Sequence, residues 1–184
     1  MGKIHILNNK LLNITLDRLT QQLIENHDDF TDSALMGLQP KGVYLAERIK
    51  ARLEKLGIQV PLGYLDTTFY RDDFRRRDTP LKPNATKVPF IIEGKRVILI
   101  DDVLYTGRSV RAAMSAMLAF GRPEHIELLV LIDRKYSRDV PIEANYVGKS
   151  VNTIQSQRVL AQWKELGYDQ DDIWLINKQE LTSE

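Results

Sequence analysis

The chain has 184 residues and a formal net charge of +1, from 26 basic and 25 acidic residues. This balance excludes the strong overall charge that favours nucleic acid or a membrane surface, although a local basic patch stays open. Hydrophobic residues make up 43% of the chain, and the absence of cysteine excludes disulfides, thiolate nucleophiles and cysteine-ligated metals. We expect one globular domain over residues 1–184 with a substantial core.

The first residues contain no apolar stretch like that of a signal peptide, and no apolar run approaches the ~18 residues of a membrane span. We therefore expect a cytoplasmic protein with no membrane partner. His5, His27 and His125 are scattered without helical spacing, so a histidine metal site is not expected.

The amino-terminal half predicts alternating strands and helices. These are a strand at Ile4–Leu7, a helix after Asn13 on the spacing of Leu16, Leu19 and Leu23, a strand at Ala34–Leu38, a helix from Val43 to Leu56, and a strand at Pro61–Tyr70. The polar stretch Arg71–Lys87 is too long for a packed connection, and loops of this kind are usually functional lids or disordered.

The carboxyl-terminal half begins with the wholly apolar run Val97–Ile100, which is typical of a buried parallel strand. A helix at Ser109–Phe120 and strands at Ile126–Ile132 and Ile173–Ile176 should follow, while Arg158–Leu166 fits a helix or a strand. The alternation predicts an α/β fold with a mainly parallel central sheet flanked by helices. Binding sites in such folds lie at the carboxyl ends of the strands.

Chemistry-bearing residues concentrate after the strand at Val97–Ile100. Asp101 and Asp102 end the strand, and a short loop containing Thr106 and Gly107 leads into a helix. The amino end of a helix and the N–H groups of such a loop form a phosphate cradle, and glycine lets the backbone approach an anion closely. The two acids are placed to accept hydrogen bonds from sugar hydroxyls. The segment thus predicts a site for a phosphorylated sugar.

Two other interpretations of this segment stay open on the residues alone. The acids can be solvated residues at a strand end, with Ser109 as a simple helix cap. An apolar strand followed by acids also occurs in Walker B segments and in receiver domains. The chain has no Walker A partner, and a receiver domain would place its acids and its lysine on different strands of a shorter chain.

Four apolar residues, two acids, three variable residues and Thr-Gly resemble the motif with which type I phosphoribosyltransferases bind phosphoribosyl diphosphate (PRPP). The resemblance implies that Asp101 and Asp102 hold the ribose hydroxyls. It implies that the loop binds the 5′-phosphate and its neighbouring groups, through Val103, Leu104, Tyr105, Thr106, Gly107, Arg108 and Ser109. It also implies a lid over about residues 71–88.

Pro40, Lys41 and Gly42 lie between a predicted strand and helix, where the same enzymes keep a pyrophosphate loop. The resemblance implies that Lys41 faces the pyrophosphate and acts in catalysis together with the two acids. Without the resemblance, Lys41 would be a surface lysine in a strand-to-helix turn.

Longer segments resemble one subgroup, the pyrimidine-operon regulator and uracil phosphoribosyltransferase family. They are Leu65–Asp73, Asp101–Ala113, Phe120–Pro123, Leu131–Arg134, Val140–Ile142 and Tyr146–Lys149, within a match over most of residues 14–160. This resemblance implies the type I phosphoribosyltransferase fold. It also implies a small hood formed by the N-terminal strand and residues of about 134–160.

The resemblance implies transfer of the phosphoribosyl group of PRPP to uracil, with UMP and pyrophosphate as products. Tyr105 stands where purine enzymes usually carry an acid, which suits uracil. Arg134 would meet an exocyclic oxygen of the base, and Val159 would hold the ring through its backbone. Without the family they would be a surface arginine and a core valine. We expect Mg²⁺ to arrive with PRPP rather than in a metal site built by the protein, and we expect a homodimer or higher homo-oligomer.

The chain departs from the family at three places. The pyrophosphate loop, usually Thr-Arg-Gly, is Pro40-Lys41-Gly42, which keeps the charge but loses the guanidinium fork and predicts weaker catalysis or altered substrate use. Ser150–Ile154 replaces a more usual Asn-Ile-Pro-Thr-Ser in the hood. Regulators of the family tend to carry His-Glu where this chain has Gln21-Gln22.

The net charge of +1 gives no broad electrostatic footprint for RNA either. The sequence therefore favours the uracil enzyme over two alternatives. One is a UMP-sensing, RNA-binding regulator of transcriptional attenuation with little catalysis, and the other is a purine-type phosphoribosyltransferase.

Overall fold

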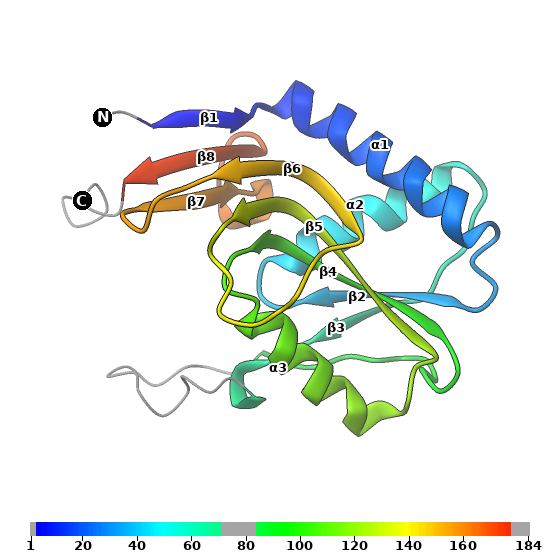
Figure 1. Cartoon of the computed structure of the whole chain (residues 1–184). Coiled ribbons are helices and arrows are strands. Elements are labelled where there is room, and N and C mark those ends of the chain that lie inside the picture. Colours follow the sequence, from blue (N-terminus) through cyan, green and yellow to red (C-terminus); the bar gives the residue numbers. More distant parts are fainter. Residues whose placement is uncertain (1–2, 71–83, 178–184) are drawn as a thin grey trace.

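A wholly parallel five-stranded sheet forms the centre of the protein in the computed structural model, which describes residues 3–70 and 84–177 (Figure 1). The strand order is β3-β2-β4-β5-β6. The bounds are β2 Ser33–Leu38, β3 Leu62–Leu65, β4 Arg96–Leu104, β5 His125–Lys135 and β6 Tyr146–Asn152. The predicted α/β fold with a mainly parallel sheet is confirmed. The chain order reverses between β2 and β4, and ligands bind at the carboxyl ends of strands at such a point.

The second sheet is antiparallel, with the order β1-β8-β7. It consists of β1 Ile4–Leu7, β7 Gln157–Gln162 and β8 Asp172–Asn177. Its side chains share one core with the end of β5, since Val159 and Ile173 belong to the same cluster as Leu131 and Ile132. The small sheet therefore lies beside the carboxyl end of the central sheet, as Figure 1 also shows.

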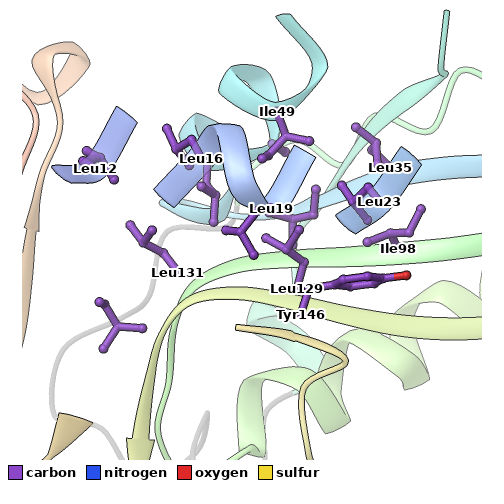
Figure 2. Close-up of a cluster of buried hydrophobic side chains, with 14 of the residues drawn as sticks. Leu12, Leu16, Leu19, Leu23, Leu35, Ile49, Ile98, Leu129, Leu131 and Tyr146 are labelled. Atoms are coloured by element: carbon purple, nitrogen blue, oxygen red, sulfur yellow. The ribbon is translucent and has the colours of Figure 1, made fainter. Parts of the chain in front are cut away.

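Helices cover both faces of the central sheet (Figure 1). Helices α1 (Asn9–His27) and α2 (Gly42–Lys55) lie on one face, and α3 (Arg108–Met117) lies on the other. Along α1, Leu12, Leu16, Leu19 and Leu23 recur at helical spacing and are almost fully buried. Figure 2 shows this row above Leu129 and Leu131 of β5. Burying each leucine stabilises the fold by roughly 1.5–3 kcal/mol.

Several predicted elements have different bounds in the structure. The first helix was expected after Asn13 but begins at Asn9, because the side chain of Asn8 caps it by accepting the N–H of Leu11 at 2.9 Å. The strand expected at Pro61–Tyr70 ends at Leu65. There the carboxylate of Asp66 accepts the N–H of Thr68 at 3.1 Å, which turns the chain into a short 3₁₀ helix, Thr68–Tyr70.

In the carboxyl-terminal half, β4 extends through both acids to Leu104, whereas the sequence placed the acids at the strand end. The third helix begins at Arg108 and ends at Met117, and a 3₁₀ turn, Leu118–Phe120, completes the predicted span. The ambiguous segment Arg158–Leu166 contains strand β7 followed by another 3₁₀ turn, Lys164–Leu166. Strand β6 was not predicted, because its polar residues carry no strand signal. Of the expected lid at 71–88, residues 71–83 lie outside the described residues.

A buried polar cluster joins the amino ends of the central strands, at the edge of the sheet opposite the predicted site. The His27 imidazole contacts Ser33 Oγ through Nδ1 at 2.8 Å and Glu127 Oε2 through Nε2 at 3.0 Å. Tyr146 Oη and a guanidinium nitrogen of Arg96 donate to the Glu127 carboxylate at 2.6 and 2.8 Å. The cluster therefore ties α1 to four strands of the sheet.

We expect this cluster to make the folded state less stable as the pH is lowered. Burial lowers the pKa of His27 below 6.5, although Glu127 opposes the shift. Burial alone would raise the pKa of Glu127, but Tyr146, Arg96 and His27 together outweigh burial and lower that pKa. Both groups bind protons more readily in the unfolded chain, so stability declines as pH falls below the ordinary histidine value and declines further below that of glutamate.

Thermal unfolding of the wild type and of His27→Gln at about pH 7.5 and about pH 5.5 tests this expectation. When the pH is lowered between these two values, the melting temperature of the wild type should fall by more than that of the variant. His125→Gln is the control, because His125 is exposed. Equal pH dependence in the wild type and His27→Gln would contradict the assignment to His27.

Candidate functional site

Two carboxylates and a lysine meet near the carboxyl end of β4. Asp101 and Asp102 are partly exposed, and Asp101 Oδ1 accepts the N–H of Asp102 at 2.9 Å. Although Asp102 as a whole is partly exposed, the protein packed around its carboxyl removes solvation and raises the pKa of that group, and the positive charge of Lys41 is the largest opposing influence. Lys41 thus lies within electrostatic reach of Asp102, although the two residues are far apart in sequence. The three charges can hold a polar, anionic ligand with hydroxyl groups.

The loop that carries Lys41 packs directly on β4. It joins β2 to α2 and contains Pro40, Lys41 and Gly42. A Cβ atom added to Gly42 would lie 2.4 Å from the carbonyl oxygen of Ile100 and 3.0 Å from the Cα of Asp101. Only glycine permits this approach, so Gly42 brings the loop to the acids, at the point where the strand order reverses.

The loop after β4 ends at the amino terminus of α3. Gly107 is the residue that precedes the helix, with φ of +85°, and no side chain caps this end of α3. Ser109 therefore lies inside the helix and is not the cap, which corrects the simple-cap interpretation. A helix amino end carries about half a positive charge and directs N–H groups outward, so Tyr105–Ser109 can bind a phosphate.

Arg134 forms a second wall across from this loop. Its guanidinium carbon lies 3.8 Å from the centre of the Tyr105 ring, Nε donates to Thr153 Oγ1 at 2.8 Å, and a terminal nitrogen donates to the carbonyl of Gln157 at 3.0 Å. The residue is 4% exposed, and no carboxylate among the residues that the structure describes forms an ion pair with it. A buried cation with only neutral partners can attract a polarised carbonyl oxygen.

Val159 lies two residues after Gln157 on β7, an edge strand of the small sheet. Its side chain is buried in the core, and its main chain pairs in register with Leu175. The carbonyl of Gln157 is directed at Arg134. Because main-chain groups of residues i and i+2 leave a strand on the same side, those of Val159 also face the Arg134 side. This direction is compatible with the backbone contact that the sequence implied.

A pocket of about 470 Å³ lies beside the loop at Tyr105 and Thr106 and includes Thr153, the hydrogen-bond partner of Arg134. It is lined by Tyr105, Thr106, Tyr136, Ser137, Arg138, Asp139, Thr153, Ile154 and Gln155. The sequence alone assigns no role to the residues from 136 to 139 or to Thr153, because nothing in a polar loop indicates which side chains turn toward a site. Over the residues that the structure describes, no group of three or more His, Cys, Asp or Glu side chains is arranged to hold a metal ion. Within the same residues, no helix is long and apolar enough to cross a membrane.

Comparisons with known proteins agree with this geometry. Residues 5–165 match the phosphoribosyl transferase domain. The bifunctional protein PyrR of Listeria welshimeri is 45% identical over 90% of this chain and 91% of its own. That of Halalkalibacterium halodurans is 43% identical over 88% of this chain and 91% of its own.

Solved structures with a similar fold include a hypoxanthine-guanine phosphoribosyltransferase from Bacillus anthracis, with a TM-score of 0.70 and 14% identity over 94% of this chain and 96% of that one. A hypoxanthine phosphoribosyltransferase of Trypanosoma cruzi has a TM-score of 0.74 and 12% identity, over 97% of this chain and 93% of that one. At such low identity these structures show the fold alone, and the predicted type I phosphoribosyltransferase fold is confirmed. The chain therefore belongs to the phosphoribosyltransferase family and, within it, is a relative of the bifunctional PyrR proteins.

Proposed function

We propose that the chain is a uracil phosphoribosyltransferase that converts uracil and PRPP to UMP and pyrophosphate. The observation that supports the proposal is that four features lie together at the carboxyl end of the central sheet. These are the Lys41 loop, the acidic pair, the uncapped amino end of α3, and the buried Arg134 wall. They suit, in that order, the pyrophosphate, the ribose hydroxyls, the 5′-phosphate and the carbonyl oxygens of a pyrimidine.

The residues of the site act by positioning and by charge. Asp101 and Asp102 accept hydrogen bonds from the ribose hydroxyls, and Tyr105–Ser109 hold the 5′-phosphate. As the bond from C1 to the pyrophosphate oxygen lengthens, the sugar becomes oxocarbenium-like, and the two carboxylates stabilise its positive charge. The pyrophosphate leaves with the bonding electrons toward Lys41. A ring nitrogen of uracil, held by Arg134, bonds to C1 and loses its proton to solvent.

The residues present fit a magnesium ion that is bound mainly by the substrate. Two adjacent carboxylates are too few ligands to enclose Mg²⁺, which usually keeps waters and phosphate oxygens in its shell. Bound with PRPP near Asp101 and Asp102, the ion would neutralise diphosphate charge.

The wall around Arg134 supports a pyrimidine as the base. Tyr105 occupies the position before Thr106 and Gly107, and its ring packs against the Arg134 guanidinium. The tyrosine supplies no carboxylate for a purine ring proton. Arg134 can donate to a carbonyl oxygen of uracil, while the outward main chain of Val159 can pair with the polar edge of the ring.

Arg134→Lys is expected to lower kcat/KM for uracil about tenfold or more, with KM for PRPP little changed. Lysine keeps the charge but cannot donate to Thr153 and Gln157 at once, nor stack flat on Tyr105. Steady-state kinetics with each substrate varied in turn checks this. A decrease of the same size in kcat/KM for PRPP would show that Arg134 does not act on the base.

Nucleotide formation from PRPP and magnesium with uracil, hypoxanthine and guanine in parallel tests the proposal itself. UMP from uracil alone is expected. A purine nucleotide would contradict the assignment of the base, and no product with any base would favour the regulator.

The second candidate is an RNA-binding regulator that senses UMP, since the relatives at 43–45% identity carry the name bifunctional. A regulator requires RNA affinity that falls steeply with salt and changes with UMP. Filter binding of a pyrimidine-operon leader RNA, with and without UMP, tests it. A scrambled RNA of equal length is the control, and equal affinity for both would contradict the regulator.

We also propose that residues 1–184 act as one domain, with the β1-β8-β7 sheet and the pocket residues beside it as the hood. The structure differs from the hood bounds of the sequence in two elements, since β6 belongs to the central sheet and β8 joins the small one. A homodimer or larger homo-oligomer is proposed as well. Sedimentation velocity tests the assembly, and a monomer at all concentrations would contradict it.

A further inference from the structure

Arg138 stands out among the pocket residues because its guanidinium joins separate parts of the proposed site. Nε donates to the carbonyl of Ile142 at 3.0 Å. One terminal nitrogen donates to the carbonyls of Tyr105 at 2.6 Å and Arg134 at 2.9 Å. The other terminal nitrogen pairs with the carboxylate of Asp133. Four acceptors in three segments of the chain thus converge on one side chain.

Two of these four acceptors are main-chain carbonyls of the residues that define the site walls, Tyr105 and Arg134. Tyr105 opens the loop that ends at α3, and Arg134 carries the buried guanidinium that lies on the Tyr105 ring. Arg138 therefore fixes the backbone on both sides of that stacked pair. The distance between the phosphate-binding loop and the base wall depends on this link.

Neighbouring contacts strengthen the same connection. The N–H groups of Asp139 and Val140 donate to the carbonyl of Thr106 at 3.0 and 3.2 Å, and the Asp139 carboxylate accepts Arg108 Nε at 2.9 Å. The segment from 138 to 140 is thereby bound along the loop from 105 to 108. The Arg108–Asp139 pair is about half exposed and contributes little, whereas Arg138 is 22% exposed and Asp133 is 4% exposed.

Only arginine can make these bonds together. Its five N–H groups point in fixed directions around a plane, while the three donors of lysine leave from one atom. The Asp133 carboxylate keeps Lys135 at 3.1 Å when Arg138 is changed, so it does not become a buried charge without a partner. Replacement of Arg138 therefore removes the connection without removing the charge balance around Asp133.

We propose that Arg138 is a positioning residue that couples the 5′-phosphate loop to the base wall, so that the two ends of a nucleotide are held at a fixed spacing. The proposal rests on the proposed function of the site. Among the described residues, the hydrogen bonds of Arg138 join it to the two walls and not to the Lys41 loop, so binding of pyrophosphate should be independent of it.

Arg138→Lys tests this coupling through the affinities of three ligands, measured by calorimetry with magnesium. UMP spans both walls, ribose 5-phosphate occupies the loop and the acids, and pyrophosphate occupies the Lys41 loop. The affinity for UMP should fall by roughly tenfold to a hundredfold and that for ribose 5-phosphate by less, because a hydrogen bond to a charged group is lost on each side. The affinity for pyrophosphate should stay within about twofold of the wild type.

Arg52→Lys is the matched control. Arg52 is 19% exposed and also makes three kinds of bond, to Asp17, Asn13 and the carbonyl of Arg48, but it lies far along α2 from Gly42. Its three affinities should equal those of the wild type. Equal losses for all three ligands in Arg138→Lys, or no loss for any, would overturn the proposal.

Failure of the proposed function gives a different result. If the wild type neither forms nor binds UMP, the assignment of uracil is wrong. Ribose 5-phosphate and pyrophosphate contain no base, so the contrast between them still tests Arg138. If Arg138→Lys then bound ribose 5-phosphate as tightly as the wild type does, the proposal for Arg138 would be wrong.

Discussion

Asp102→Asn is expected to abolish nucleotide formation, with a loss of at least about a hundredfold in kcat, while the protein stays folded. The substitution keeps the shape of the side chain but removes the charge that faces both Lys41 and the oxocarbenium-like sugar. It also replaces an acceptor pair for the ribose hydroxyls by an amide. The measurement is UMP formation from saturating PRPP and uracil, together with thermal unfolding of the same preparation.

Stability should change in the opposite direction to activity. Because burial raises the pKa of Asp102, the folded state disfavours the carboxylate relative to the unfolded chain. This contribution is absent at low pH and destabilises the fold as pH rises through the ordinary and then the raised pKa. Asparagine has no such dependence, so the melting temperature of the variant at neutral pH should equal or exceed that of the wild type.

Near-normal turnover of Asp102→Asn would contradict the assignment of the acidic pair. A large loss of melting temperature would instead show that Asp102 is structural. The two measurements on one variant therefore separate a role toward the substrate from a role in the fold.

Gly42→Ala should reduce both activity and stability. The added Cβ would lie 2.4 Å from the Ile100 carbonyl oxygen, a backbone atom of a central strand that cannot move aside. The loop must therefore shift away from β4, which costs about 1–3 kcal/mol and moves Lys41 from Asp102. We expect a melting temperature lower by several degrees, corresponding to about 2–4 °C per kcal/mol, and a kcat reduced at least about tenfold.

Gly57→Ala is the control for the loss of stability alone. Gly57 has φ of +80°, and an added Cβ would meet no atom within 4 Å, so alanine there costs backbone strain but no collision. It lies beyond the far end of α2 from Gly42. Activity per folded molecule should be normal in Gly57→Ala, and an equal activity in Gly42→Ala would contradict the role assigned to the loop.

Features that reside in one continuous segment could be predicted from the sequence. The segment from Val97 to Ser109 carries its own strand, acids, Thr-Gly turn and helix start, so local backbone preferences are sufficient to predict that a strand, a short loop and a helix follow one another there. The same applies to the α/β class, because apolar strands alternate with helical spacing along the chain. Strand ends and helix starts were displaced where a single side chain, such as Asn8 or Asp66, formed a local hydrogen bond.

Only the tertiary structure decided which distant segments meet. Strand β6 mixes apolar and polar residues without a clear alternation and acquires its place by pairing with β5, while β1 and β7 are joined through β8. The nearness of Lys41 to Asp102 depends on Gly42 packing against β4. Arg134 lies beside Tyr105 because β4 and β5 pair in the central sheet, and it bonds to Gln157 of the small sheet. Arg138 has no signal in the sequence, because three of its four acceptors are carbonyl groups whose directions follow from the packed backbone rather than from residue type. Long-range hydrogen bonds of this kind form only once the core has fixed the chain, which is why residue pattern alone cannot reveal them.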